Sequence, residues 1–223
     1  MAGKTAIIIG ASRGLGLGLA QELAGRGWQV TATQRSASPA LAEAASAGGI
    51  TVATVDIDDA ASVAALMAQA PGPFDLVFIN AGVTGPQATA DTVALDDLAA
   101  LMMTNAVAPV RTARTLVGHV KPGGTIAFMT SILGSVTLRT HAMAELYSAS
   151  KAALNSLTRG FAAIEGKDFA VLSLHPGWVK TDMGGAGADI DVATSVAGLA
   201  DVLEAESAAG HRYLDYTGKT LPW

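Results

Sequence analysis

The sequence predicts an α/β protein built on a single, doubly wound parallel sheet with helices on both faces. Six apolar runs of strand length recur along the chain, and a helical pattern follows each of them. Hydrophobic residues make up 50% of the chain and charged residues only 15%, which is typical of a sheet covered on both sides. Because 223 residues suit one core and no linker or internal repeat interrupts them, we expect one domain over residues 1–223.

The strands are expected where short apolar runs lie between turn residues. They are Thr5–Ile9, Gln29–Thr33, Thr51–Val55, Leu76–Ile79, Thr125–Met129 and Ala170–Leu174, and a short last strand is expected from Tyr213.

Helices are expected in the intervals. They are Leu15–Arg26, Pro39–Ala47, Ser62–Gln69, Leu95–His119, Leu146–Ile164 and Val192–Glu206. Ser38 and Pro39 offer an N-cap and a first-turn proline for the second helix, and Asp59 precedes the third. The alternation of strands and helices predicts repeated βαβ units.

Composition excludes several classes of protein. The net charge is −5 and no basic cluster occurs, so a nucleic-acid partner is not expected. The absence of cysteine excludes disulfides, thiolate metal sites and thiol catalysis. The longest stretch without Asp, Glu, Lys or Arg is the 17 residues from Pro122 to Leu138, which glycine, serine and threonine interrupt. We therefore expect no membrane association and a soluble, cytoplasmic protein.

A glycine loop follows the first strand. In Gly10-Ala-Ser-Arg-Gly14-Leu-Gly16, Gly10 permits a tight turn, Gly14 lets the backbone approach a pyrophosphate, and Gly16 lets the next helix pack close to the sheet. Free N–H groups at the helix start would hold the phosphates. Such turns also occur for packing alone, so the loop by itself leaves that alternative open.

Polar residues and turns follow four later strands. They are Asp56-Ile57, Asn80-Ala81-Gly82, Thr130-Ser131 and the segment His175-Pro-Gly-Trp-Val-Lys-Thr181. Since the carboxyl ends of parallel strands meet at one end of a sheet, these residues should line a single ligand site.

Tyr147 and Lys151 lie four residues apart in a predicted helix, so their side chains share one face. The Lys151 ammonium can lower the pKa of the Tyr147 phenol from its reference value of about 10, which would make the phenol an acid usable near neutral pH. Alone, such a pair is more often solvated helix surface.

These features together resemble the short-chain dehydrogenase/reductase family, whose members share a Rossmann-type sheet, the glycine loop, Asn80-Ala-Gly82, a serine after the fifth strand and Tyr147-x3-Lys151. Within it, Ser131-Ile-Leu-Gly-Ser135, the segment from His175 and the terminal Leu-Pro-Trp223 resemble C-factor and sniffer-type carbonyl reductases.

The resemblance implies a role for each of four residues. Tyr147 donates a proton to the substrate, Ser131 binds the substrate carbonyl, and Lys151 holds the nicotinamide ribose while acidifying Tyr147. Asn105 supports a water relay to Lys151. Ser135 is a rival to Ser131 in the same loop.

The expected cofactor is NADP(H) rather than NAD(H). The second strand ends at Gln34-Arg35 without the acidic residue that would bind the adenosine ribose of NAD, and Arg35 and Arg13 can pair with a 2′-phosphate. The expected cofactor contacts are Gly10, Ser12, Arg13, Gly14, Leu15, Gly16, Arg35, Asp56, Ile57, Asn80, Ala81, Gly82, Tyr147, Lys151, Pro176, Gly177, Val179 and Thr181.

The expected activity is NADPH-dependent reduction of a small aldehyde or ketone, or the reverse oxidation of an alcohol. The alternative is a C-factor-like sensor that binds NAD(P) with little or no turnover; an epimerase or dehydratase would need more chain after His175. The glycine-rich stretch Asp182–Asp189 offers little apolar cover, so weak substrate selectivity is expected, with Trp178 and Met183 at the mouth. Apolar residues on several faces of the expected helices Leu95–His119 and Leu146–Ile164 predict a homodimer, or a homotetramer.

Overall fold

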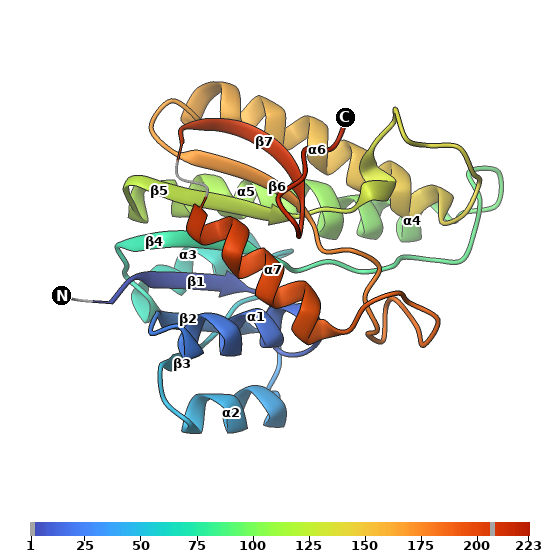
Figure 1. Cartoon of the computed structure of the whole chain (residues 1–223). Helices are drawn as coiled ribbons and strands as arrows, with labels where there is room; N and C mark the ends of the chain where they lie inside the picture. The colour runs from blue at the N-terminus through green and yellow to red at the C-terminus, as the bar shows by residue number, and fades with distance from the viewer. Residues whose placement is uncertain (1–2, 206–207) are drawn as a thin grey trace.

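A seven-stranded parallel sheet runs through the middle of the computed structural model, which describes residues 3–205 and 208–223 (Figure 1). The strand order is β3-β2-β1-β4-β5-β6-β7. The strands are β1 Thr5–Ile9, β2 Gln29–Gln34, β3 Ile50–Thr54, β4 Phe74–Ile79, β5 Val120–Met129, β6 Ala170–His175 and β7 Gly210–Asp215. The predicted parallel, doubly wound sheet is confirmed.

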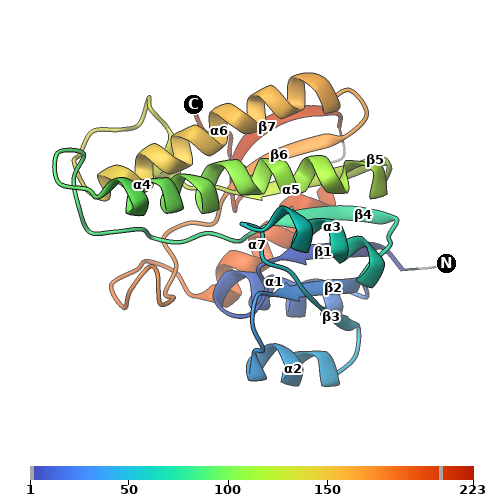
Figure 2. The ribbon, with the colours of Figure 1, turned by 180° about the vertical axis from the view of Figure 1, so that it is seen from behind.

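Helices cover both faces of the sheet. They are α1 Gly14–Gly25, α2 Pro39–Ser46, α3 Ala60–Gln69, α4 Leu95–Met102, α5 Ala108–Leu116, α6 Glu145–Glu165 and α7 Val192–Ala205. In Figure 1, α1 and α7 lie in front of the sheet; in the reverse view of Figure 2, α3, α4, α5 and α6 lie in front of it.

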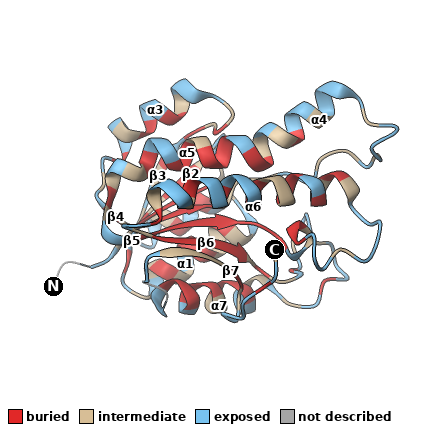
Figure 3. Cartoon of the chain, turned by 90° about the horizontal axis from the view of Figure 1, so that it is seen from above, coloured by how far each residue is buried: buried red, intermediate tan, exposed pale blue. Residues whose placement is uncertain are grey.

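Two apolar cores result, one on each face. Ala6 and Ile8 of β1 belong to the core under α1 and α7, while Ile7 and Ile9 belong to the core under α3, α5 and α6. Because both sets are fully buried, this central strand is an almost uninterrupted apolar run rather than an alternating one. Figure 3 shows the buried residues along the strands and on the inward sides of the helices.

The helix expected over Leu95–His119 is interrupted in the structure. A π-helical segment, Met103–Val107, separates α4 from α5, and a 3₁₀ turn, Val117–His119, follows α5. Pro109 lies at the start of α5 and has no N–H to donate to the carbonyl of Asn105 four residues earlier, so a regular α-helix cannot continue through this point.

Other boundaries agree to within a few residues, except that β5 begins at Val120 rather than Thr125. The predicted helix starts are confirmed, since Ser38 Oγ accepts a hydrogen bond from Leu41 N at 3.2 Å and Asp59 Oδ1 accepts one from Ala61 N at 2.8 Å. The expected end of the last helix, Glu206, lies outside the described residues. No helix among the described residues is long and apolar enough to cross a membrane.

Candidate active site

The glycine loop has the backbone geometry that only glycine adopts readily. Gly10 and Gly14 have φ angles of +87° and +54°. A Cβ on Gly16 would lie 2.1 Å from the Gly10 carbonyl oxygen, so Gly16 is what lets α1 begin so close to the loop. Thr33 at the end of β2 and Asn80 after β4 fix the loop: Gly10 N donates to Thr33 Oγ1 at 3.0 Å, and Asn80 Nδ2 donates to Gly10 O at 2.6 Å.

A long cleft of about 800 Å³ lies at the carboxyl end of the sheet, beside this loop. Most of the expected cofactor contacts line it: Gly10, Ser12, Arg13, Gly14, Leu15, Arg35, Asp56, Ile57, Asn80, Ala81, Gly82, Tyr147, Lys151, Pro176 and Thr181. Gly16 is buried beneath the loop and does not line the cleft. Gly177 and Val179 line an adjoining cavity instead.

The cleft also contains residues that sequence reasoning missed. Ser36 to Ala40 form its wall after β2, and Ser38 Oγ donates to Ser12 O at 2.7 Å, which ties that wall to the glycine loop. Ser38 was recognisable only as a helix start. Thr104 lines the cleft and donates to Asp58 Oδ2 at 2.7 Å, a contact across 46 residues that no local pattern could reveal.

Tyr147 and Lys151 share one face of α6, as expected, and both line the cleft. Lys151 is 3% exposed, its Nζ donates to Met129 O at 3.0 Å, and the same nitrogen lies 5.7 Å from the centre of the Tyr147 ring. Burial lowers the pKa of Lys151 to about 8.

The expected lowering of the Tyr147 pKa by Lys151 is wrong. Burial raises the pKa of the phenol to about 12, against a smaller opposing effect of a hydrogen bond with Ser131. Desolvation disfavours the charged phenolate more than this hydrogen bond favours it. The phenol is therefore protonated at neutral pH.

Asn105 is completely buried in the π-helical segment. Its Nδ2 donates to Val83 O at 2.8 Å and to Ser150 Oγ at 3.0 Å, and its Oδ1 accepts from Val83 N at 2.8 Å. A Cβ on Gly82 would lie 3.2 Å from Asn105 Oδ1 and 3.4 Å from Lys151 Nζ. The side chain thus joins the loop after β4 to α6 beside Lys151, while the water relay stays an expectation.

The two candidate serines have different surroundings. Ser131 Oγ accepts from Leu133 N at 3.2 Å, and Ser131 lines the adjoining cavity beside Tyr147. Ser135 Oγ donates to Pro222 O at 2.6 Å and lines neither the cleft nor the cavity. The geometry therefore favours Ser131 as the serine that can reach a substrate.

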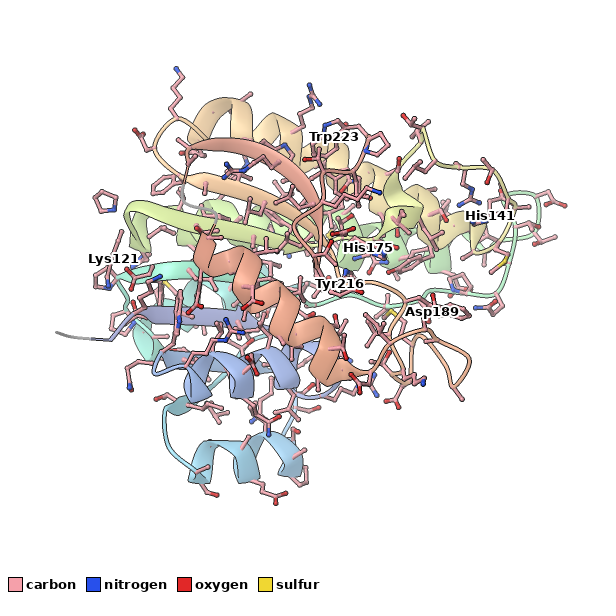
Figure 4. All side chains as sticks on the ribbon, viewed as in Figure 1. Lys121, His141, His175, Asp189, Tyr216 and Trp223 are labelled. Atoms are coloured by element: carbon pink, nitrogen blue, oxygen red, sulfur yellow. The ribbon has the colours of Figure 1, made fainter. Side chains whose placement is uncertain are left out.

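The adjoining cavity has a volume of about 670 Å³ and meets the cleft at Tyr147. Loops beyond the carboxyl end of the sheet enclose it, and Figure 4 shows His141 and Asp189 on two of them. Trp178 and Met183 line it as expected, and both are about half exposed.

The lining of this cavity, among the described residues, includes no lysine or arginine. Its titratable members are Tyr147, Glu145 and His175. Burial lowers the pKa of His175 to about 4, so this imidazole is neutral at pH 7. Among the described residues that line the cavity, Glu145 is therefore the one with a formal charge at neutral pH, and that charge is negative.

Comparison with known proteins agrees with this geometry. Residues 4–189 match the short chain dehydrogenase family, and the chain belongs to this family of oxidoreductases. It is 35% identical over 156 residues to C-signal of Myxococcus xanthus, an alignment that covers 68% of this chain and 94% of that protein. This bears out the resemblance to C-factor-like proteins.

Solved structures of the same family are closely similar. One described as a short-chain dehydrogenase/reductase from Burkholderia multivorans with bound NADP has a TM-score of 0.96 and 40% identity, covering 99% of both chains. A carbonyl reductase from Pseudomonas aeruginosa PAO1 in complex with NADP has a TM-score of 0.90 and 40% identity, covering 99% of this chain and 100% of that one. The carbonyl reductase Sniffer of D. melanogaster has a TM-score of 0.89 and 29% identity over the same shares.

Proposed function

We propose that this protein is an NADPH-dependent carbonyl reductase that uses Tyr147 as its general acid. The observation that carries the proposal is the junction at Tyr147, which lines both the long cleft and the adjoining cavity, with Ser131 on one side and Lys151 on the other. A nucleotide in the cleft and a carbonyl compound in the cavity would meet at this phenol.

The chemistry follows from where charge develops. Bound NADPH supplies the hydride to the carbonyl carbon. Ser131 Oγ orients the carbonyl oxygen, and the Tyr147 hydroxyl gives that oxygen a proton as negative charge builds on it. Lys151 stabilises the phenolate that remains, and holds the ribose. In the reverse direction the same phenolate takes the proton from an alcohol.

The cleft has groups suited to two parts of this cofactor, the pyrophosphate and the adenosine 2′-phosphate. The backbone of the glycine loop at the start of α1 can receive the pyrophosphate. Arg13 and Arg35 line the cleft, and β2 ends without an acidic residue that would repel a 2′-phosphate. The two bacterial structures with NADP support the same choice.

The test is the oxidation of NADPH, followed by absorbance with a panel of aldehydes, ketones and quinones. Tyr147→Phe should lower turnover by about two orders of magnitude or more, the loss typical of a missing general acid. Binding of NADPH, followed by fluorescence, should persist. A Phe variant that reduces carbonyls at the wild-type rate would exclude Tyr147 as the acid.

A sensor that binds NADP(H) without turnover is the alternative, and the similarity to C-signal is the observation that favours it. A sensor has no need of a proton donor beside a buried lysine and a substrate-sized cavity. The same assay separates the two functions, since a sensor would bind NADPH and oxidise it with no member of the panel.

A further inference from the structure

Ser131 is held through its main chain as well as through its hydroxyl group. Its carbonyl oxygen accepts a hydrogen bond from Gly134 N at 2.8 Å, which closes the 3₁₀ turn Ile132–Gly134. The same oxygen accepts a second hydrogen bond, at 2.6 Å, from the hydroxyl of Tyr213. This second bond joins the turn to β7, 82 residues further along the chain.

Tyr213 is itself fixed in place. It is 1% exposed, and in β7 it is paired in register with Ser173 of β6. Burial raises the pKa of its phenol to about 12, so the hydroxyl remains a donor at any pH where the protein would be assayed.

Asn155 of α6 connects the residues on the two sides of Ser131. Its Oδ1 accepts from Thr130 Oγ1 at 2.8 Å, and its Nδ2 donates to Gly134 O at 3.2 Å. The residues on both sides of Ser131 therefore belong to one buried polar network. Such a network is rigid when each member has its partner.

The segment Leu221–Trp223 covers Tyr213 from the outside, where Figure 4 shows Trp223 near β7 and α6. The rings of Trp223 and Tyr213 lie 5.0 Å apart with a tilt of 31°, and Leu221 N donates to Tyr213 O at 2.8 Å. Trp223 O accepts from Thr137 N at 3.0 Å, so the segment also holds the chain that follows the turn.

We propose that Tyr213 is a positioning residue for Ser131: its hydroxyl fixes the main chain of the turn, so that Ser131 Oγ stays directed at the carbonyl oxygen of a bound substrate beside Tyr147. This inference rests on the proposed function, in which Ser131 binds that oxygen. A displacement of the order of 1 Å in such a contact is enough to slow a reaction severalfold or more.

Tyr213→Phe in the full chain is the decisive variant, because it keeps the ring that packs against Trp223 and removes only the hydroxyl. It should lower kcat about fivefold to tenfold, the effect of losing one ordinary hydrogen bond. The Kd of NADPH should stay within about twofold of wild type. Amide exchange at Gly134, whose N–H donates to the same Ser131 carbonyl oxygen, should become faster.

Tyr216→Phe is the matched control, since the described residues offer the Tyr216 hydroxyl no hydrogen bond, and it should change none of these quantities.

A double-mutant cycle separates positioning from general stability. In a Ser131→Ala background, Tyr213→Phe should change kcat by less than about twofold, because the hydroxyl it positions is gone. The same fold-loss in both backgrounds, or unchanged kcat in Tyr213→Phe alone, would overturn the inference. A wrong proposed function would give a different result. The wild-type protein would oxidise no NADPH with any carbonyl compound, while amide exchange at Gly134 would still be faster in Tyr213→Phe, because the hydrogen bond from Tyr213 to Ser131 O does not depend on the reaction.

Discussion

At the scale of single residues, burial governs the pair that we place at the centre of the reaction. It moves the pKa of the Tyr147 phenol up to about 12 and that of Lys151 down to about 8, so it favours the neutral form of each. A protonated phenol is what reduction of a carbonyl requires. The charge of Lys151 is the variable that pH controls in the physiological range.

The pH profile of kcat/KM for carbonyl reduction should reflect this. Tyr147 stays protonated up to pH values near 12, whereas Lys151 is charged below about pH 8 and loses its charge above it. The rate should therefore be steady at pH 6 to 7 and fall as the pH rises through about 8. A profile that stays flat to pH 10 would contradict the assigned role of the ammonium.

Arg35 should decide the choice of cofactor. Arg35→Asp should repel the 2′-phosphate and shift the ratio of kcat/KM for NADPH to that for NADH by at least about tenfold, which corresponds to about 1.4 kcal/mol. Steady-state rates with each cofactor give the ratio. Lys167→Asp makes the same charge change on an exposed turn away from the cleft and should leave the ratio unaltered. Equal use of both cofactors by the unmodified protein would refute the preference.

At the scale of elements, the site depends on three segments that meet at Gly82. The loop after β4, the π-helical segment and α6 come together there because a glycine leaves room for Asn105 Oδ1 and Lys151 Nζ. The strand itself and its Asn-Ala-Gly ending were predictable. The meeting of the three segments was not.

Gly82→Ala should therefore damage activity more than stability. The new Cβ would lie 3.2 Å from Asn105 Oδ1, tight enough to displace this amide beside Lys151, and 3.4 Å from Lys151 Nζ itself, and we expect kcat to fall at least about tenfold. The backbone at Gly82 does not need a positive φ, so Tm should change little. Gly160→Ala is the control, because Gly160 lies on the exposed side of α6 and nothing lies within 4 Å of the new Cβ. This variant should leave kcat unchanged and raise the free energy of unfolding by about 0.5–1 kcal/mol. Equal kcat values in both variants would rule out this role of Gly82.

Much of the fold and of the cleft could be predicted from the sequence because the relevant signals are local. Alternating apolar runs located the strands, and glycine spacing located the loop before α1. Three features could not be predicted so. Pro109 is itself a local signal of a break in this helix, but the π-helical form of Met103–Val107 could not be predicted from it. The Tyr147 pKa depends on how deeply the phenol is buried, and the contact of Tyr213 with Ser131 joins residues 82 positions apart.

At the scale of the whole molecule, the cavity beyond the sheet determines which carbonyl compounds can enter. Its mouth is open at Trp178 and Met183, and the neighbouring stretch Asp182–Asp189 contributes small side chains. Weak selectivity among small aldehydes and ketones is therefore still our prediction, and strong preference for one bulky substrate would contradict it. The charge of the cavity wall also predicts which small carbonyl compounds are poor substrates.

Carboxylated substrates should be poor ones, because Glu145 lies in the wall and no described basic residue of the wall offsets it. We expect kcat/KM for benzaldehyde to exceed that for 4-carboxybenzaldehyde by about tenfold, the scale of one unfavourable charge contact of about 1.4 kcal/mol. Glu145→Gln should reduce the difference, and Glu43→Gln on exposed α2 should not. A carboxylated aldehyde reduced as well as the neutral one would refute this expectation.

The structure leaves fewer exposed apolar residues for the predicted dimer than the sequence suggested. Leu101 and Val110, two apolar residues of the expected helix Leu95–His119, are buried within the protomer, whereas Val107 on the π-helical segment and Leu157 on α6 are 42% and 41% exposed. A dimer through these helices should sediment at twice the mass of one chain, and Val107→Glu should shift it toward the monomer. A wild-type protein that sediments as a monomer would contradict the prediction.

The return of the chain along β7 also affects whether a strand of another molecule can add to this side of the sheet. A parallel sheet has two outer strands, and an outer strand with free N–H and C=O groups is a template on which another chain can add. Here residues 219–221 turn back antiparallel to β7: Asp215 N donates to Lys219 O at 2.9 Å, and Leu221 N donates to Tyr213 O at 2.8 Å. The same segment that supports Ser131 therefore pairs with β7 between Tyr213 and Asp215, and prevents strand addition along this part of the open side of the sheet.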